Sequence, residues 1–472
     1  MSRKLDFFIL GFVILLGLPV MAQQQVGHTE YILTTSPSSL ASLDHRHGLN
    51  FSSTVWHNSN YGYAVYVVTD PSSRNSAQLQ SELNSDSATI SFEANQVVQL
   101  PELSGTTSAV LAQSTDSILD SLPDRTLVTF GGATVPSNYV QQPATTIIHW
   151  QDALQRSGLT GAGTVAVIDT GVDPDHPALT RVLVPGFDFT RNQNGASELA
   201  DLNPNVAASL SQSTDSILDS KRVFQLSSST LGILTQSTDS ILDGTPSAFG
   251  HGTMTAGLVH LIAPSTKIMP LKAFNIDGTS NMANIVNAIY YAVDHGANII
   301  SMSFEMIESS PGLQGALDYA TDHGVIAIAA AGNDGRQTAV YPAAEEGVIG
   351  IGSTNNNDQR SIFSNFGSPD VIFAAPGEGV ISTYPANHYA AGWGTSFSAP
   401  IVAGAAALVF QNHPNNLQCS VMQALAHAVQ VPQMGFGRID LYQALTARGP
   451  IPGFSDPSCE SGRQDGGRRR PD

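Results

Sequence analysis

Three side chains that lie far apart in the chain have the chemistry of a nucleophile and its activating partners. They are the carboxylate of Asp169, the imidazole of His251 and the hydroxyl of Ser396. A hydroxyl attacks a carbonyl carbon when a neighbouring base takes its proton, and a carboxylate can orient that base. Asn333 adds a side-chain amide that can donate to an oxyanion. The four residues are therefore the parts that hydrolysis of a peptide bond requires.

Two of these residues follow predicted buried strands. Asp169 comes directly after the apolar run 164–168, and Asn333 comes after the apolar run 325–330. Open α/β sheets place their sites at the carboxyl ends of parallel strands, so we expect both side chains at one edge of a sheet.

The other two residues open predicted helices. His251, flanked by glycines, precedes the apolar stretch 254–262, and Ser396 precedes the stretch 397–410. A helix N-terminus favours developing negative charge. The backbone N–H of Ser396 is thus the expected companion of Asn333 in an oxyanion hole.

The segments around the four residues resemble the signatures of the subtilisin-like serine proteases, also called subtilases or peptidase family S8. The resemblance extends over residues 147–447 and rests on the order Asp, His, Ser with Asn between the last two. The segments are Val167-Ile168-Asp169-Thr170-Gly171-Val172, Gly250-His251-Gly252-Thr253, Ala331-Gly332-Asn333 and Gly394-Thr395-Ser396-Phe397-Ser398-Ala399-Pro400. It implies that Ser396 is the nucleophile and His251 the general base and later the general acid. It also implies that Asp169 orients His251 and that Asn333 donates to the oxyanion.

The resemblance also implies a substrate-binding segment, from which this chain departs. Members of the family usually have a Ser-apolar-Gly segment on an edge strand that pairs with the substrate backbone, whereas Ser303-Phe304-Glu305 lacks the glycine. We assign substrate binding to four residues, Ser301, Ser303, Phe304 and Gly332. Glu305 either faces the cleft and favours basic substrate side chains, or it is a loop carboxylate that faces solvent.

No metal and no cofactor is expected. Asp173 and Asp175 lie near Asp169 in the sequence. Calcium takes about six to eight oxygen ligands. A structural calcium ion would therefore need more converging groups than the sequence identifies.

The segments outside the main domain divide into four parts. Residues 1–22 have the basic head, apolar run and small-residue end of a secretory signal peptide. Residues 23–103 predict a small α+β ferredoxin-like domain in the order β-α-β-β-α-β. Residues 104–142, rich in Ser, Thr, Pro and Gly, predict a linker. Residues 448–472 predict a disordered tail.

Residues 143–447 predict an α/β domain with a mostly parallel sheet and helices on both faces. Strand-like runs that are apolar throughout, such as 267–271 and 298–302, alternate with helical stretches such as 284–295. The subtilase resemblance implies the same fold. It further implies that residues 23–103 are an inhibitory prodomain, which chaperones folding and blocks the cleft until it is removed.

Composition limits the class of partner and the compartment. A formal net charge of −19 argues against a nucleic-acid partner, because phosphate binding needs clustered Lys and Arg. No second apolar run is long enough to span a membrane, so we expect a secreted or periplasmic protein without a membrane partner after signal removal. Its expected partners are protein or peptide substrates and its own prodomain. Cys419 and Cys459 either pair or remain thiols.

An octapeptide, Gln-Ser-Thr-Asp-Ser-Ile-Leu-Asp, occurs identically three times. The copies are residues 113–120, 212–219 and 236–243. Their irregular spacing excludes a solenoid repeat. They are either an inert duplicated loop insertion, which we favour, or a surface ligand near the site.

Two other functions compete with peptide hydrolysis. An α/β-hydrolase esterase uses Gly-x-Ser-x-Gly and the order Ser, Asp, His, whereas here Ser398 replaces the second glycine and the partners precede Ser396. A catalytically silent binding protein on the same fold is the stronger alternative, because a fold does not fix a function.

Overall fold

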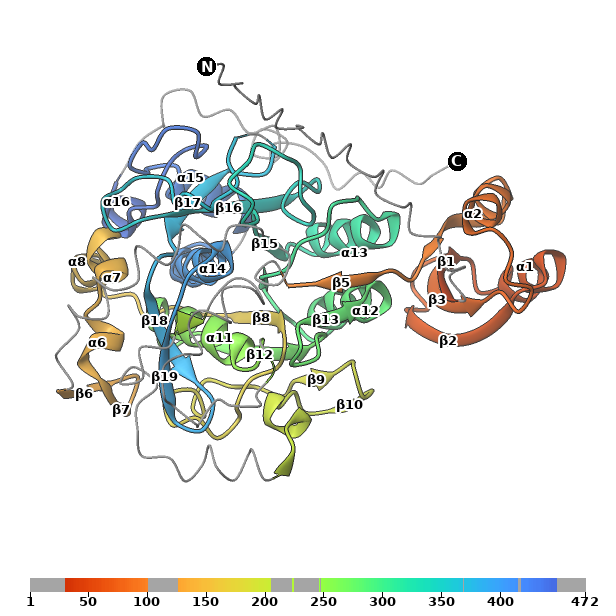
Figure 1. Ribbon diagram of the computed structural model, residues 1–472. Helices are drawn as coiled ribbons and strands as arrows, with labels where there is room; N and C mark the ends of the chain where they lie inside the picture. Colours follow the sequence, from red (N-terminus) through yellow and green to blue (C-terminus); the bar gives the residue numbers. More distant parts are fainter. Residues whose placement is uncertain are drawn as a thin grey trace, which may run out of the picture.

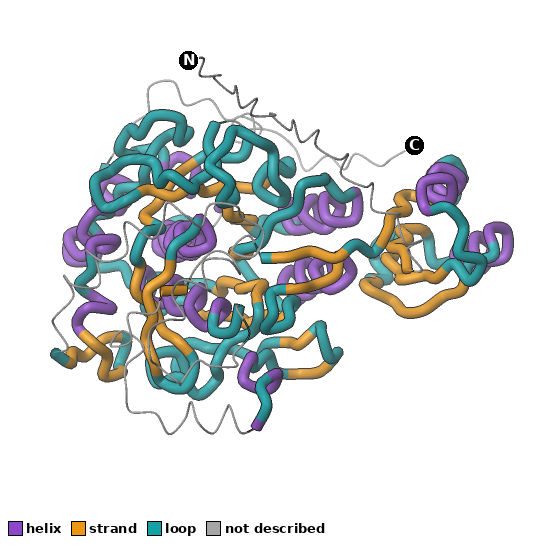
Figure 2. Tube along the Cα trace, in the orientation of Figure 1, coloured by secondary structure: helices purple, strands orange, loops and turns teal. Residues whose placement is uncertain are grey.

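The structure is a computed structural model that describes residues 30–100, 126–204, 223–224, 246, 248–367, 369–414 and 417–447 (Figure 1). The expected signal peptide, the expected tail and all three octapeptide copies lie outside the described residues. The described chain forms a small N-terminal domain and a large α/β domain, which Figure 2 shows as separate groups of helices and strands.

The N-terminal domain is a four-stranded antiparallel sheet with two helices. Its sheet order is β2-β3-β1-β4. The elements are β1 (Glu30–Thr35), α1 (Leu40–His47), β2 (Asn50–His57), β3 (Ala64–Thr69), α2 (Ser76–Asn84) and β4 (Thr89–Ala94). The order β-α-β-β-α-β agrees with the arrangement predicted from the sequence.

The two faces of this small sheet are buried against different partners. Tyr31 and Leu33 of β1 point to one face, where they pack with Leu43 of α1 and Leu79 of α2. Ile32, which points to the opposite face, belongs to a hydrophobic cluster shared with the large domain. The alternation of side chains along β1 therefore joins the two domains.

The large domain is built on an eight-stranded sheet in the order β10-β9-β12-β8-β14-β15-β16-β17. All neighbouring strands run parallel except β10 and β9. The strands are β8 (Thr164–Asp169), β9 (Phe187–Asp188), β10 (Gln193–Asn194), β12 (Lys267–Lys272), β14 (Ile299–Met302), β15 (Ile326–Ala330), β16 (Val348–Thr354) and β17 (Phe373–Pro376).

Helices cover both faces of this sheet, as predicted. α11 (His251–Ile262) and α14 (Thr395–Asn412) cover one face, and α12 (Met282–Asp294) and α13 (Pro311–Asp322) cover the other. Val165 and Val167 of β8 pack toward the first pair of helices, whereas Ala166 and Ile168 pack toward the second. The strand is apolar throughout because neither of its faces meets water. The predicted fold class is confirmed.

Shorter elements complete the large domain. β18 and β19 form an antiparallel hairpin beside α11, and β11 runs parallel to β19. These elements are α8 (Trp150–Ser157), the 3₁₀ helix η1 (Glu198–Asp201), β11 (Val223–Phe224), β13 (Thr279–Asn281), β18 (Val380–Tyr384), β19 (His388–Gly392), α15 (Leu417–Leu425) and α16 (Leu441–Thr446).

The structure differs from the predicted linker in its last part. The chain is ordered from residue 126 on, as β6 (Leu127–Phe130), β7 (Ala133–Pro136) and α6 (Ser137–Val140), followed by α7 (Pro143–Ile147). The Tyr139 hydroxyl donates to the carbonyl oxygen of Gly257 in α11 at 2.6 Å. The side chain of Gln142 exchanges hydrogen bonds of 2.9 and 2.8 Å with the backbone of Ile381 in β18. Residues 126–142 therefore pack as part of the large domain.

Two further observations bear on the sequence predictions. Cys419 in α15 is disulfide-bonded, and Cys459 lies outside the described residues. Within the described ranges, no helix combines the length and the hydropathy that a membrane span needs.

Candidate active site

Asp169 and His251 form a buried pair at the carboxyl end of β8. Asp169 is the last residue of β8 and His251 is the first residue of α11, and each is 1 % exposed. The Nδ1 atom of His251 lies 2.7 Å from Oδ1 of Asp169. Because an ionised carboxylate can only accept, Nδ1 carries the hydrogen and Nε2 is the basic ring nitrogen.

The carboxylate of Asp169 is held in place by two further donors. The backbone N–H of Thr170 donates to Oδ1 at 2.7 Å, and the Thr255 hydroxyl donates to Oδ2 at 3.1 Å. Both oxygens are thus engaged. The orientation of the imidazole is fixed through a carboxylate that cannot rotate without breaking these bonds.

Ser396 lies in the first turn of α14 at the same edge of the sheet. The ring of the next residue, Phe397, has its centroid 5.6 Å from that of His251. The Ser396 hydroxyl donates to the carbonyl oxygen of Ser303 at 3.5 Å, and the Ser303 hydroxyl donates to the carbonyl oxygen of Ser396 at 2.9 Å. The segment after β14 and the start of α14 are therefore tied together at the candidate nucleophile.

Asn333 is fixed to the residue that precedes Ser396. Its Oδ1 accepts from the backbone N–H of Thr395 at 2.9 Å and from the Thr395 hydroxyl at 3.0 Å. The backbone N–H of Gly332 donates to the same hydroxyl at 3.1 Å. Because a backbone N–H can only donate, these contacts identify which end of the amide is oxygen. The Nδ2 group is the end that Thr395 does not hold.

The predicted substrate-binding residues divide into two groups. Ser303 and Gly332 lie beside Ser396 and Asn333, as described above. The Phe304 side chain is fully buried, with its ring 5.2 Å from that of Phe274, and Ser301 is a buried residue inside β14. In the segment after β14, the backbone is therefore available to contact a substrate, whereas the Phe304 ring is not.

A strand from the N-terminal domain lies between two edges near this site. β5 (Val97–Gln99) pairs antiparallel with β13, where Gln99 lies opposite Thr279 (Figure 1). On its other side, Gln99 forms an antiparallel bridge with Glu305. The backbone N–H of Leu100 donates to the carbonyl oxygen of Gly278 at 3.0 Å. The edges at β13 and Glu305 thus border a channel that holds an extended chain.

Sequence analysis missed a fully buried acid behind the pair, Glu198 of η1. Its carboxylate accepts from the backbone N–H of Gly250 at 2.8 Å and from the Thr170 hydroxyl at 3.1 Å. It also accepts from the backbone N–H of Thr253 at 3.2 Å and from the Thr253 hydroxyl. Burial raises the pKa of Glu198, and the hydrogen bonds from Thr253 and Gly250 oppose that rise. Glu198 joins the segment after Asp169 to the start of α11.

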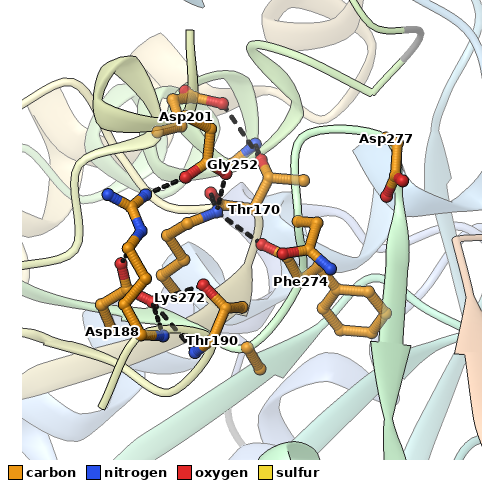
Figure 3. Close-up of polar contacts among 12 residues, drawn as sticks. Thr170, Asp188, Thr190, Asp201, Gly252, Lys272, Phe274 and Asp277 are labelled. Carbon is orange, nitrogen blue, oxygen red and sulfur yellow. Dashed lines mark hydrogen bonds and ion pairs between the residues drawn. The ribbon is translucent and has the colours of Figure 1, made fainter. Parts of the chain in front are cut away.

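Lys272 is a second missed residue of this region. It lies opposite Asp169 in the β12–β8 register. Its Nζ donates to the carbonyl oxygens of Thr170 at 2.8 Å and Phe274 at 2.6 Å, and it pairs with Oδ2 of Asp201 at 2.7 Å (Figure 3). Burial lowers the pKa of Lys272, and nearby carboxylates, Asp188 first, oppose that fall. A charged residue directly after the apolar run 267–271 is the sequence signal that could have pointed to it.

No metal centre is evident in the part of the chain that the structure describes. Among these residues, no group of three or more His, Cys, Asp or Glu side chains is placed to hold a metal ion. Asp173 accepts from the backbone N–H groups of Asp175 at 2.9 Å and Ala386 at 2.8 Å. These contacts give Asp173 a role in holding two loops together.

Comparison with known proteins identifies the family. The sequence profile of the subtilase family, Peptidase_S8, matches residues 161–437, which is more than half of the chain. This chain belongs to the subtilase family. The matched region of this subtilase contains Asp169, His251, Asn333 and Ser396, so the resemblance inferred from the sequence is confirmed.

Curated relatives of this subtilase share about a third of its residues over the aligned region. The thermophilic serine proteinase of Bacillus sp. (strain AK1) is 33 % identical over 60 % of this chain and 61 % of its own length. Thermitase of Thermoactinomyces vulgaris is 32 % identical over 53 % of this chain and 75 % of its own length. Subtilisin DY of Bacillus licheniformis is 37 % identical over 35 % of this chain and 65 % of its own length.

The aligned part of this subtilase thus spans about three fifths of the Bacillus proteinase. Among solved structures, one described as a lanthipeptide protease matches with a TM-score of 0.48 at 24 % identity, over 64 % of this chain and 94 % of that one.

Proposed function

We propose that this subtilase is a secreted serine endopeptidase that hydrolyses peptide bonds through Ser396, His251 and Asp169. The observation that carries the proposal is the buried 2.7 Å pair of Asp169 and His251, at the same sheet edge as Ser396 and Asn333. Membership of the subtilase family and the names of its curated relatives, which include serine proteinases, support it. A binding protein that used the fold only as a scaffold would not need all four residues.

In the proposed reaction, the oxygen of Ser396 bonds to the carbonyl carbon of the substrate, and its proton passes to Nε2 of His251. The imidazolium, which Asp169 stabilises, then gives this proton to the leaving amine as the peptide bond breaks. Water repeats the sequence on the acyl-enzyme and releases the acid. The Ser396 hydroxyl must first turn from Ser303 toward the imidazole, and catalytic hydrogen bonds are often longer before substrate binds.

Asn333 is proposed to stabilise the negative charge that develops on the substrate oxygen. Its Oδ1 is engaged with Thr395, so its amide group has a fixed orientation beside the start of α14. The backbone N–H of Ser396 would be the second donor. Donors that are already oriented need no rearrangement in the transition state.

The N-terminal domain is proposed to be a prodomain that keeps the enzyme inactive. β5 occupies the channel between β13 and Glu305, and the Trp56 side chain of the same domain donates to Asp294 of α12 at 2.9 Å. A substrate strand cannot use the edges of the channel while β5 pairs with them. Export through the expected signal peptide remains part of the proposal.

The proposal is tested by Ser396→Ala in the full chain. After cleavage within residues 101–125 and removal of the N-terminal domain, wild-type protein should hydrolyse casein and react with a fluorophosphonate probe. The variant treated in the same way should do neither, because the nucleophilic oxygen is gone. Ser398→Ala is the control, since the Ser398 hydroxyl donates to the carbonyl oxygen of Ala375 at 2.9 Å instead of meeting substrate. Undiminished hydrolysis by Ser396→Ala would remove Ser396 from the mechanism.

The alternative is a catalytically silent binding protein, and the same experiment separates the two. One observation favours it, the contact of the Ser396 hydroxyl with Ser303. If wild-type protein neither hydrolyses casein nor reacts with the probe, whether or not the chain has been cleaved within residues 101–125, the protein is better described as a catalytically silent binding protein.

A further inference from the structure

The register of β5 shows where the residue at the scissile bond of a substrate would lie. Gln99 lies opposite Glu305 in an antiparallel bridge. In such a pairing, a chain that continues by two residues comes opposite Ser303. The carbonyl oxygen of Ser303 is 3.5 Å from the hydroxyl of Ser396. A substrate strand in this register therefore brings the residue opposite Ser303 to the nucleophile.

Glu305 is a diagonal neighbour of that residue. Side chains two positions apart on a strand share a face, so Glu305 and the residue opposite Ser303 point to the same side of the pair. Diagonal neighbours in an antiparallel pair are about 7–8 Å apart, which long side chains can bridge. Lys and Arg are long enough to do so.

The Glu305 carboxylate turns toward the candidate oxyanion residue and not away into solvent. Glu305 is only partly exposed. A Cβ atom added at Gly332 would overlap with Oε2 of Glu305 and would lie 2.5 Å from Nδ2 of Asn365. The carboxylate thus lies against the glycine that directly precedes Asn333.

A buried amide accompanies this carboxylate. Asn365 is fully buried, and its Oδ1 accepts from the backbone N–H groups of Asp334 and Arg336, each at 3.1 Å. Its Nδ2 makes no hydrogen bond to any residue that the structure describes. Beside Gly332, the chain therefore presents a carboxylate and an amide, and an apolar side chain of a substrate would cover these polar groups without offering them a hydrogen bond.

We propose that Glu305 makes this enzyme prefer a basic residue, Arg or Lys, directly before the scissile bond. This inference rests on the proposed function. The glycine usual at this position of the family has no side chain, whereas the carboxylate of Glu305 forms a charge-assisted hydrogen bond with a guanidinium or ammonium group. Glu305 is then a specificity residue that contacts the substrate, and it takes no part in the proton transfers.

The test compares Glu305→Gln with wild type on peptide amides that differ only in the residue before the scissile bond. Glutamine keeps the size of the side chain and removes its charge. We expect wild type to favour Arg and Lys over Leu and Phe. In Glu305→Gln, kcat/KM for the basic peptides should fall about 10- to 100-fold with little change for the apolar ones, since a charged partner in a site is lost.

Two further variants sharpen the result. Glu308→Gln is the matched control, because Glu308 is an exposed acid three positions further along the same segment. It should leave every peptide unaffected. Glu305→Lys should shift the preference to Asp or Glu before the scissile bond, which a merely structural defect would not produce. Mass-spectrometric mapping of casein cleavage sites measures the same preference without designed peptides.

The outcomes separate this inference from the function on which it rests. Hydrolysis without a basic preference, or a basic preference that persists in Glu305→Gln, overturns the role of Glu305 and leaves the peptidase intact. If wild type cleaves neither peptides nor casein and does not react with a fluorophosphonate, the proposed function fails, and this inference fails with it.

Discussion

Glu198 has no contact with a substrate in the mechanism proposed above, but it binds the neighbours of two proposed catalytic side chains, His251 and Asp169. Its oxygens bind the backbone N–H of Gly250, the residue before His251, and the hydroxyl of Thr170, the residue after Asp169. One buried carboxylate thus sets the separation between the end of β8 and the start of α11. We regard it as a positioning residue.

Glu198→Gln should reduce both stability and turnover. The side-chain NH₂ of the introduced glutamine would face hydrogen-bond donors that have no other acceptor. Each buried donor left without an acceptor costs about 1–3 kcal/mol. We expect a loss of about 3 kcal/mol in the free energy of unfolding on this basis. The kcat should fall about 10- to 100-fold with little change in KM, because small displacements of catalytic groups are costly. Urea unfolding and steady-state kinetics measure these effects.

Glu346→Gln serves as the control, because Glu346 is an exposed acid. It should change neither quantity. A Glu198→Gln variant that unfolds at lower urea but keeps its full kcat would contradict the positioning role and leave only a structural one. The pH profile of kcat/KM should keep its shape in the variant, since His251 and Asp169 are both retained.

The sequence allowed the candidate catalytic residues to be located but not Glu198. Asp169, His251 and Ser396 each border a long apolar run that periodicity reveals. Glu198 lies in a 3₁₀ turn of four residues, and such a short turn has no periodic pattern. Its burial depends on Thr170, Gly250 and Thr253, which only the folded chain brings near it.

At the scale of elements, the central strands β8, β12, β14, β15 and β16 were predictable because almost all of their residues are buried and most are apolar. The two-residue strands β9 and β10 were not, since such short segments show no periodic pattern. The predicted order β-α-β-β-α-β includes β2, but the sequence did not show its bounds, since six of its eight residues are exposed and only Val55 and Trp56 are buried. Its register is set by pairing with β3, a contact that the local sequence does not encode. β6 and β7 were not predicted either. They form a short hairpin in a Ser- and Thr-rich region, and their pairing is likewise not encoded in the local sequence.

The segment that holds α6 and α7 against β18 depends on Gln142. Gln142→Leu should lower the free energy of unfolding by about 2–4 kcal/mol, because the buried N–H and C=O of Ile381 would both lose their partner. Activity per folded molecule should not change. Gln141→Leu is the control on the adjacent, exposed position and should be nearly neutral. Equal urea midpoints for the two variants would show that the segment does not need this contact.

At the scale of the whole molecule, several contacts hold the N-terminal domain on the large domain. Besides β5 and Trp56, the carboxylate of Glu93 accepts from the backbone N–H of Gly312 at 2.7 Å and from the Ser310 hydroxyl at 2.9 Å. β5 pairs in the channel, and Trp56 of β2 packs on the two helices beneath it. The Trp56 ring stacks on Tyr290 of α12 with centroids 4.2 Å apart, and its Nε1 donates to Oδ2 of Asp294 at 2.9 Å. Because Trp56 and β5 belong to different parts of one domain, weakening either contact should free the channel more often.

Trp56→Ala in the full chain therefore tests the inhibitory role of this domain. Truncating a buried tryptophan costs about 3–5 kcal/mol, so the domain should release the channel at least 100-fold more often, at about 1.4 kcal/mol for each factor of ten. The rate at which the intact chain reacts with a fluorophosphonate, followed on the full-length gel band, should rise accordingly. Phe51→Ala, on the same strand but 51 % exposed, should leave the rate unchanged. If both variants react as slowly as wild type while Ser396 remains competent after cleavage, the Trp56 contact does not limit access, and inhibition must rest on the other contacts of the domain, such as β5 and Glu93.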